Sequence, residues 1–408
     1  MEPEPSTPAP AVVAVVVTCD PGPWFEEALA SLAAQDYPNL SVLVIDSASL
    51  ADPTGRVAGV LPGAFVTRLA TRTGFGSAAN RVLAAVEGAS HYVFCHDDVA
   101  LAPDAVRALV EEAFRSNAGV ATPKYVEWER PDHLLSVGAT SDKVGVAHDL
   151  VEPGELDQEQ HDAVREVLVA PSGATLVRAD LFSALGGFEP AVDQFGEDLD
   201  LSWRARIAGA RVVTVPAARV RHLQAFRRGE RAGWATPAAR RRATRLAEQH
   251  RVRTLLTCYR WFNLVWILPI AILYVLGEAA TRLVEGRPGD AWHTLGNFTA
   301  GARDPSSLWR SRRSVQRHRQ SGDASLRRLQ SRGNARLRAF LRSRVEGVRE
   351  GLPPVPLASA RRRLPGPDTV AGDDGPAGGY RDRLAVARRA TPLVAAVLLA
   401  LFVFGSRG

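Results

Sequence analysis

AVVAVVVT, residues 11–18, is a continuous run of apolar and β-branched residues, the pattern of a strand that is buried on both faces. The turn Asp20-Pro-Gly-Pro follows it, and a helix is predicted from residue 24 to 34. Further buried strands are predicted at 40–45, 64–69 and 91–95, and further helices at 75–87 and 103–116. Strands that alternate with helices predict an α/β domain with a Rossmann-like, mostly parallel sheet and helices on both faces.

Polar residues lie at the ends of three of these predicted strands. Thr18 ends the first strand, Asp46 follows the second, and Asp97 and Asp98 follow the strand at 91–95. Ligands of open α/β sheets bind beyond the carboxyl ends of the strands. These four side chains are therefore candidates for one ligand site.

The rest of the chain divides by composition. Residues 1–10 are acidic and Pro-rich, lack the basic and apolar regions of a signal peptide, and are predicted to be a disordered leader. The α/β domain is predicted to cover residues 11–225. It is followed by a basic helical region at 226–350, a linker at 351–385, and at 386–408 the start of a transmembrane helix that more chain would complete.

The composition is that of a globular protein, with 46% hydrophobic and 23% charged residues among 408. The net charge is +6, and the surplus of basic residues, nearly all Arg, lies after Arg204. A basic tail beside apolar segments points to anionic lipid before nucleic acid. Three widely spaced cysteines fit buried thiols in a reducing compartment and show no zinc-binding spacing.

The apolar segment at 255–277 is predicted to lie in the membrane interface rather than to cross the bilayer. Arg260, Asn263 and Pro269 interrupt it, and the stretch that follows carries 23 Arg and no Lys up to residue 390. A single crossing would place this basic block outside, against the positive-inside rule. We therefore expect an interfacial or re-entrant helix at the cytoplasmic face of a bacterial inner membrane. A buried pair of soluble helices is the alternative.

Four motifs follow one another along the first 225 residues. They are residues 15–18 with 33–38 and 44–49; Arg72-Thr-Gly-Phe-Gly76 with Asn80; His96-Asp97-Asp98; and Gly186-Gly-Phe188 with 196–201, Val215-Pro216 and His222. In this order they resemble the family 2 glycosyltransferases with the GT-A fold. The resemblance is greatest to bacterial rhamnosyl- and galactofuranosyl-transferases of cell-envelope glycan synthesis. It implies transfer of a sugar from a nucleotide-sugar donor to a glycan acceptor.

The resemblance also assigns the donor site. A carboxylate at a strand end can accept a hydrogen bond from the ring N–H of uracil or thymine, and Asp46 holds that place in the family pattern; as an ordinary residue it would cap a turn. The resemblance puts Gly74 next to the nucleotide sugar and Arg72 where the family often has Asn. The other residues expected at the donor are Thr18, Asn80 and Asp97.

A divalent cation is expected at the donor diphosphate. Mg²⁺ and Mn²⁺ prefer oxygen ligands, so one or two carboxylates with phosphate oxygens suffice. In the family this place holds Asp-x-Asp, and here His96 stands at the first acidic position, where an imidazole suits Mn²⁺ better than Mg²⁺. The resemblance implies Asp98 as the main ligand and His222 as a second, with His96 as a ligand or as a neighbour of the metal site.

A general base is needed because a sugar hydroxyl is a poor nucleophile until its proton is removed. The family places this base at the Asp after Glu, which is Asp198. A single base opposite the leaving diphosphate implies inversion at the anomeric carbon. Acidic residues in a first helical turn are also explained by capping and the helix dipole, which accounts well for Glu197 and Asp200.

The resemblance places Gly173, Gly187 and Glu197 on the acceptor side, although Gly173 and Gly187 would also suit ordinary turns. A lipid-linked glycan is the expected acceptor, because its diphosphate would meet Arg residues at the membrane surface. Processive relatives carry Q-x-x-R-W, and this chain keeps Arg260-Trp261 without the Gln. A non-processive enzyme is therefore expected.

Other functions fit this sequence less well. Gly74-Phe-Gly-Ser-Ala-Ala79 matches a dinucleotide fingerprint, but it follows the third predicted strand rather than the first. A sugar nucleotidyltransferase needs a Gly-rich loop with Arg and Lys after the first strand, which this sequence lacks. A catalytically silent nucleotide-sugar-binding or scaffold module stays open because His96 breaks the acidic motif. Non-specific nucleic-acid binding by the tail is disfavoured against lipid.

Overall fold

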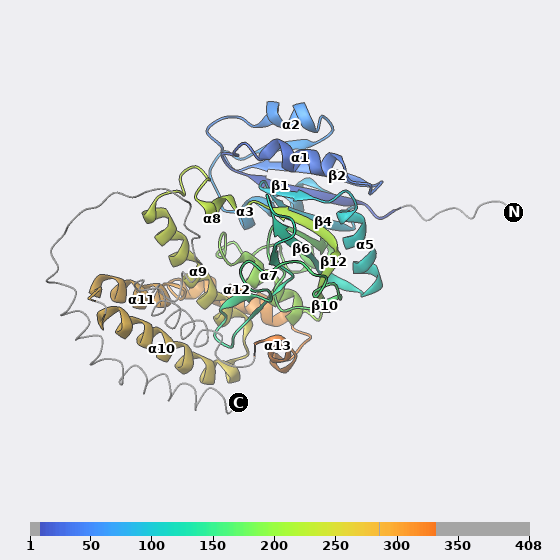
Figure 1. Cartoon of the computed structure of the whole chain (residues 1–408). Coiled ribbons are helices and arrows are strands. Elements are labelled where there is room, and N and C mark those ends of the chain that lie inside the picture. The colour runs from blue at the N-terminus through green and yellow to red at the C-terminus, as the bar shows by residue number, and fades with distance from the viewer. Residues whose placement is uncertain (1–8, 285, 332–408) are drawn as a thin grey trace, which may run out of the picture.

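A ten-stranded mixed sheet organises the N-terminal part of the chain in the computed structural model, which describes residues 9–284 and 286–331 (Figure 1). The strand order is β10-β12-β6-β11-β4-β1-β2-β3, with β5 paired to β12 and β7 to β6, while β8 and β9 form a separate hairpin. The strands are β1 Val12–Thr18, β2 Leu40–Asp46, β3 Phe65–Arg68, β4 His91–His96, β5 Val99–Leu101, β6 Ala118–Glu127, β7 Leu134–Ser136, β8 Ala139–Ser141, β9 Ala147–Asp149, β10 Arg165–Glu166, β11 Ala174–Arg178 and β12 Arg211–His222.

Parallel pairing in the first half of the sheet aligns the carboxyl ends of the strands. β1 pairs with β2 and β4, and β2 pairs with β3, all in parallel. The register places Thr18 opposite Asp46, and Val17 opposite His96. In the second half, β11 runs antiparallel between β4 and β6, and β12 runs parallel to β6. The polar strand ends predicted from the sequence thus meet at one edge of the sheet.

Helices cover both faces of this sheet, and the first strand shows why its sequence is apolar throughout. Val12, Ala14 and Val16 belong to the core beneath α1 and α5, whereas Val13, Val15 and Val17 face the core with α3, α6 and α7. Burying a valine side chain contributes roughly 1.5–3 kcal/mol, so both faces of β1 stabilise the domain. The helices are α1 Phe25–Ala33, α2 Thr54–Val60, α3 Phe75–Ala79, α4 Val82–Ala85, α5 Ala105–Arg115, α6 Ala179–Ala184 and α7 Glu197–Ile207.

Two local predictions were wrong. The single helix expected at 75–87 is divided into α3 and α4, and between them Asn80 donates its side-chain amide to the carbonyl of Phe188 and accepts from the Phe188 N–H. The strand expected to be buried at 64–69 is β3, which lies at the edge of the sheet with Phe65 69% exposed. An edge strand has a neighbour on only one side, so its apolar residues are covered incompletely.

Six helices follow the sheet domain in the described part of the chain. They are α8 Ala225–Arg228, α9 Pro237–Cys258, α10 Trp261–Val284, α11 Pro288–Ala300, α12 Pro305–Arg317 and α13 Asp323–Leu329. Helix α9 packs against α7, α11 and α12, and α10 packs against α11 (Figure 1). The apolar segment predicted to start at residue 255 begins instead at Trp261, because Leu255 and Cys258 end α9 and are buried in the core beside Trp203.

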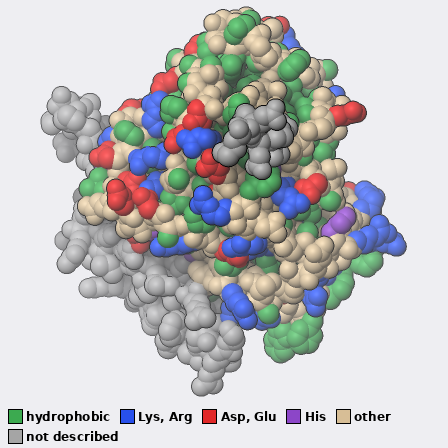
Figure 2. Space-filling view, turned by 90° about the vertical axis from the view of Figure 1, so that its right-hand side faces the viewer, with side chains coloured by type: hydrophobic (Ala, Val, Ile, Leu, Met, Phe, Trp, Pro, Cys, Tyr) green, Lys and Arg blue, Asp and Glu red, His purple; other side chains and the backbone are tan. Residues whose placement is uncertain are grey.

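Helix α10 is long and apolar enough to cross a membrane, and it is the one such helix in the described residues. Much of its surface is unburied, with Phe262 76% and Trp266 66% exposed. Figure 2 shows hydrophobic side chains projecting at the lower right edge of the molecule beneath a group of basic side chains. The predicted linker at 351–385 and the segment at 386–408 lie outside the described residues.

Candidate active site

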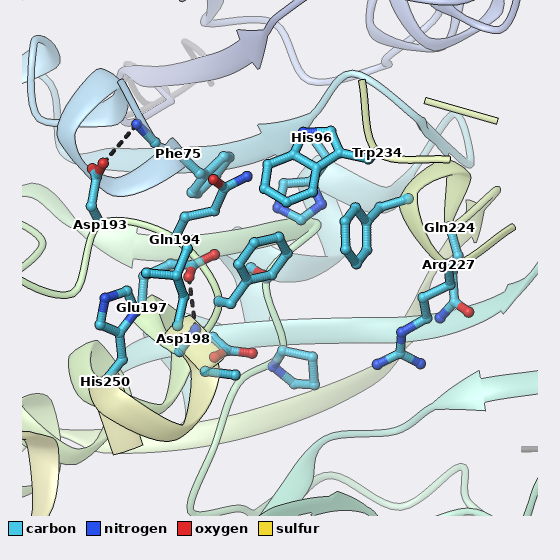
Figure 3. Close-up of a pocket in the computed structure, with 18 of the residues that line it drawn as sticks. Phe75, His96, Asp193, Gln194, Glu197, Asp198, Gln224, Arg227, Trp234 and His250 are labelled. Carbon is cyan, nitrogen blue, oxygen red and sulfur yellow. Dashed lines mark hydrogen bonds between the residues drawn. The ribbon is translucent and has the colours of Figure 1, made fainter. Parts of the chain in front are cut away.

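A cavity of about 1230 Å³ lies at the carboxyl ends of β1 and β4 and extends along α9. Its wall includes Thr18, Arg72 and Gly74 on one side, the His96-Asp97-Asp98 motif, and Glu197 with Asp198 at the start of α7. In the view of Figure 3, His96 and Trp234 lie on one side of this cavity and Glu197, Asp198 and His250 on the other. The sheet edge and the first turn of α7 therefore face a common space.

His96, Asp98 and His222 form a candidate metal cluster in this cavity. One ligand atom from each lies within 4.8 Å of the others. The Nε2 of His222 is 3.4 Å from Oδ1 of Asp98, and the Nδ1 of His96 is 3.9 Å from the same oxygen. His222 reaches the cluster because β12 pairs with β5, which places His222 opposite Val99.

The donor set of the cluster suits a cation. Oδ1 of Asp98 is buried and finds no hydrogen-bond partner among the described residues. The other carboxylate oxygen of Asp98 accepts a hydrogen bond from the Ala225 N–H at 2.8 Å, which holds the carboxylate in place. Two imidazoles and one carboxylate would hold Mn²⁺ more readily than Mg²⁺, which prefers all-oxygen coordination.

Burial and the neighbouring charges set the protonation of His96 and Asp98. Burial lowers the pKa of His96 to about 4, so this imidazole is neutral at neutral pH. Burial alone would raise the pKa of Asp98, but the neighbouring His222, His96 and Arg231 outweigh it and hold that pKa well below the usual range. A neutral imidazole and an ionised carboxylate are the ligand forms that a metal requires.

Asp97 contacts residues outside the candidate metal cluster. Its buried carboxylate accepts a hydrogen bond from the Thr18 hydroxyl at 2.6 Å and forms an ion pair with both Nη atoms of Arg231. Arg231 lies in the loop between α8 and α9, 134 residues after Asp97. Asp97 and Asp98 are therefore neighbours in sequence with separate partners.

Asp198 stands in the first turn of α7, at the cavity surface. A loop with left-handed backbone leads into it, with φ of 63° at Phe195 and 132° at Gly196. Burial raises the pKa of the Asp198 carboxyl, which makes its ionised form a stronger proton acceptor. Burial and the adjacent Asp198 raise the pKa of Glu197 to about 8, and the Glu197 carboxyl accepts a hydrogen bond from the Gly196 N–H at 2.9 Å. Two neighbouring carboxyl groups at the start of α7 thus both have raised pKa values.

A sequence model of the family described as "Glycosyltransferase like family 2" matches residues 9–246, more than half of the chain. The chain belongs to this family. It is therefore a glycosyltransferase with the GT-A fold, as its motifs predicted.

Curated relatives are similar across the same part of this glycosyltransferase. The N-acetylglucosaminyl-diphospho-decaprenol L-rhamnosyltransferases of two strains of Mycobacterium tuberculosis are 28% identical over 235 residues, which cover 53% of this chain and 76% of theirs.

The chain is also similar to solved structures, at lower identity. One is the structure of GalNAc-T7 with UDP, GalNAc and Mn²⁺, which has 15% identity and a TM-score of 0.48 over 61% of this chain and 48% of that one. A mannosyltransferase of Pyrobaculum calidifontis with GDP-Man and Mn²⁺ has 19% identity and a TM-score of 0.43 over 76% and 86% of the two chains.

Several residues that the motifs assigned to binding are not among the described residues lining the cavity of this glycosyltransferase. Oδ1 of Asp46 accepts from the Ser49 hydroxyl at 2.5 Å, and Oδ2 from the Nε of Arg68 at 2.9 Å. A base could reach this carboxylate only by displacing those bonds, and the role of Asp46 in reading the base stays a prediction. Asn80, Gly173 and Gly187 are likewise not among the residues that line the cavity.

Asn80, Gly173 and Gly187 contact residues next to the cavity lining. Asn80 ties α3 to the loop at Phe188, and a side chain on Gly187 would meet Asn80 Oδ1 at 2.3 Å. The carbonyl of Gly173 accepts from the His96 N–H at 2.8 Å, and a side chain there would meet the ring of Tyr125. Their place is explained by packing, and the roles of Asn80 at the donor and of Gly173 and Gly187 toward the acceptor stay predictions.

Three further residues in the cavity wall were not predicted from the sequence. Asp193 accepts hydrogen bonds from the N–H groups of Gly74 at 2.7 Å and Ser77 at 3.0 Å, and a Cβ on Gly74 would lie 2.5 Å from its carboxylate. His250 of α9 lines the cavity, and burial lowers its pKa. Arg231 is the third. All three come from loops or from the helix beyond the recognised motifs, so nothing in their spacing indicated the site.

Proposed function

We propose that this glycosyltransferase inverts configuration while moving a sugar from a UDP- or dTDP-sugar to a lipid-linked glycan acceptor in cell-envelope synthesis. The observation that carries the proposal is the placement of Asp198 and of the His96–Asp98–His222 cluster on the walls of one cavity. A proton acceptor and a cation site facing a common space are the two devices that this reaction needs.

The reaction assigns a separate task to each part of the cavity. The acceptor hydroxyl attacks the anomeric carbon, and its proton passes to the carboxylate of Asp198. The bond from that carbon to the diphosphate breaks, and its electron pair leaves with the diphosphate. Asp98 and His222, with His96, would hold Mn²⁺ or Mg²⁺, which neutralises charge on the leaving diphosphate.

The membrane side of the proposal is supported by α10. Its exposed aromatic residues include Trp261, Phe262 and Trp266, and the guanidinium of Arg312 lies 4.0 Å from the centre of the Trp261 ring. Arg312 itself is buried, whereas Arg260, next to Trp261 in the chain, is exposed. Exposed aromatic rings beside an exposed arginine favour binding at the interface of an anionic membrane. We place the enzyme at the cytoplasmic face of the bacterial inner membrane, where a lipid-linked acceptor would approach it. The related rhamnosyltransferases are named for such an acceptor.

Transfer assays with the full chain test the proposal. Purified protein is incubated with radiolabelled UDP- and dTDP-sugars, Mn²⁺ and a polyprenyl-diphosphate-linked N-acetylglucosamine. We expect transfer by the wild type, and in Asp198→Asn a loss of roughly 10²–10⁴ in kcat with donor binding retained, because a general base contributes about that factor. The control is Asp180→Asn, which alters a carboxylate paired with Arg178 at the surface. Nucleotide binding without any turnover by the wild type would instead support the silent module.

A further inference from the structure

Arg231 lies in the cavity wall beside the candidate metal cluster. Its side chain is 17% exposed, and its guanidinium contacts both carboxylate oxygens of Asp97. The same group lies 4.0 Å from Oδ2 of Asp98 and 5.8 Å from the centre of the Trp24 ring. A nearly buried guanidinium is thus held next to a carboxylate that is a candidate cation ligand.

The ion pair occupies a carboxylate that the family resemblance assigns to the nucleotide donor. The side chain of Asp97 has no exposed surface, and Oδ2 already accepts from the Thr18 hydroxyl. With Arg231 on both oxygens, a ribose hydroxyl could bond to Asp97 only after the guanidinium leaves. Moving a buried charge away from its partner costs several kcal/mol unless another group receives it. A second anion must therefore enter for the pair to separate.

A diphosphate is an anion with the required position and geometry. A cation held by Asp98 would also bind diphosphate oxygens, which would bring those oxygens close to this carboxylate. The guanidinium is already 4.0 Å from that carboxylate. Arginine binds phosphate oxygens through two parallel hydrogen bonds. Four other arginines line the cavity: Arg72 is paired with Asp20 at 3.0 Å and Arg251 with Glu248 at 2.7 Å, and Arg227 and Arg242 are the remaining two.

The loop that carries Arg231 contacts the rest of the active site. Gly229 and Gly233 flank Arg231 with φ of 76° and 75°, a backbone region that favours glycine. Trp234 of the same loop lies 5.5 Å, ring centre to ring centre, from Phe195, which precedes Asp198 by three residues. A shift of this loop would therefore change the contacts next to the first turn of α7.

We propose that Arg231 recognises the donor diphosphate, and that donor binding exchanges the Arg231–Asp97 ion pair for an Arg231–diphosphate pair. The exchange releases Asp97 for the ribose. This inference rests on the proposed function, since it takes the donor to be a nucleoside diphosphate sugar. It assigns Arg231 a binding role that distinguishes a diphosphate from a monophosphate.

The test compares nucleotides that differ by one phosphate. Dissociation constants for UDP, UMP, dTDP and dTMP are measured by calorimetry with MnCl₂ for the wild type, Arg231→Gln, Arg231→Lys and Arg228→Gln. Arg228 is the matched control, because it lies in the same segment but pairs with Glu129 outside the described cavity lining. We expect Arg231→Gln to lower the preference for diphosphate over monophosphate about tenfold. Arg231→Lys should lower it less, and Arg228→Gln should leave it unchanged.

The outcomes separate the inference from the function. An unchanged preference for diphosphate over monophosphate in Arg231→Gln would overturn the inference. Equal losses of affinity for diphosphates and monophosphates, together with a lower melting temperature, would also overturn it, because they would show that Arg231 only stabilises the loop structure. Arg231→Lys decides the case if Arg231→Gln does not fold, because a fully retained preference in it would also contradict bidentate recognition. Absence of binding of all four nucleotides to the wild type would overturn the proposed function as well.

Discussion

Replacing His96 by asparagine is expected to make the protein less sensitive to acid. Burial lowers the pKa of His96 to about 4, whereas a histidine of the unfolded chain has a pKa of about 6.5. Between these values the unfolded chain binds a proton that the folded chain does not. The free energy of unfolding therefore falls as the pH falls from about 6.5 to 4. Between pH 7 and pH 5 the contribution of His96 to this fall is about 2 kcal/mol, at about 1.4 kcal/mol for each pKa unit.

Urea unfolding at pH 7 and pH 5 measures this effect as a difference between two proteins. The wild type should lose about 2 kcal/mol more than His96→Asn over that interval. Glu197 has the opposite effect on the pH dependence. Its pKa is raised to about 8, so its contribution lowers the free energy of unfolding as the pH rises from about 4.5. This contribution is the same in the wild type and in His96→Asn, so it cancels in the difference. His133→Asn is the control, because His133 pairs with the exposed Asp132. Equal losses in wild type and His96→Asn would refute the lowered pKa of His96.

Two further results are expected. His222→Ala should weaken Mn²⁺ binding at least 10–100-fold, measured by the metal-dependent rise in melting temperature, while His133→Ala should not; an unchanged rise would remove His222 from the site. Trp266→Glu should weaken binding to phosphatidylglycerol vesicles roughly tenfold or more, since burying a large apolar side chain contributes about 1.5–3 kcal/mol. Phe114→Glu alters an aromatic residue that is 60% exposed on α5, and equal binding of both variants would contradict membrane contact through α10.

The sequence predicted the parts of the fold that depend on local pattern. The apolar run at residues 11–18 specifies a doubly buried strand, because its alternate residues enter both cores. The two wrong predictions have causes in the tertiary structure. Strand β3 lies at the edge of the sheet, where it has a neighbour on one side only. The helix after Gly74 is interrupted because Asn80 forms hydrogen bonds with a loop more than a hundred residues away. Such contacts leave no periodic trace in the sequence.

The site was predictable where motifs end strands or begin helices. His96, Asp98 and Asp198 line the cavity, as their positions at the end of β4 and at the start of α7 suggest, while their roles come from the family resemblance and stay predictions. His222 needed the family resemblance, since only the pairing of β12 with β5 brings it to Asp98. Arg231 lies in a glycine-bounded loop, and its contact with Asp97 depends on tertiary structure alone.

The most direct measurement is the position of Mn²⁺ in crystals grown with UDP, located by anomalous scattering. The account predicts one manganese about 2.1 Å from a carboxylate oxygen of Asp98, ligated also by His222 and by the diphosphate, with Asp198 across the cavity from it. A manganese bound away from Asp98 and His222, or a diphosphate outside the cavity, would contradict the account.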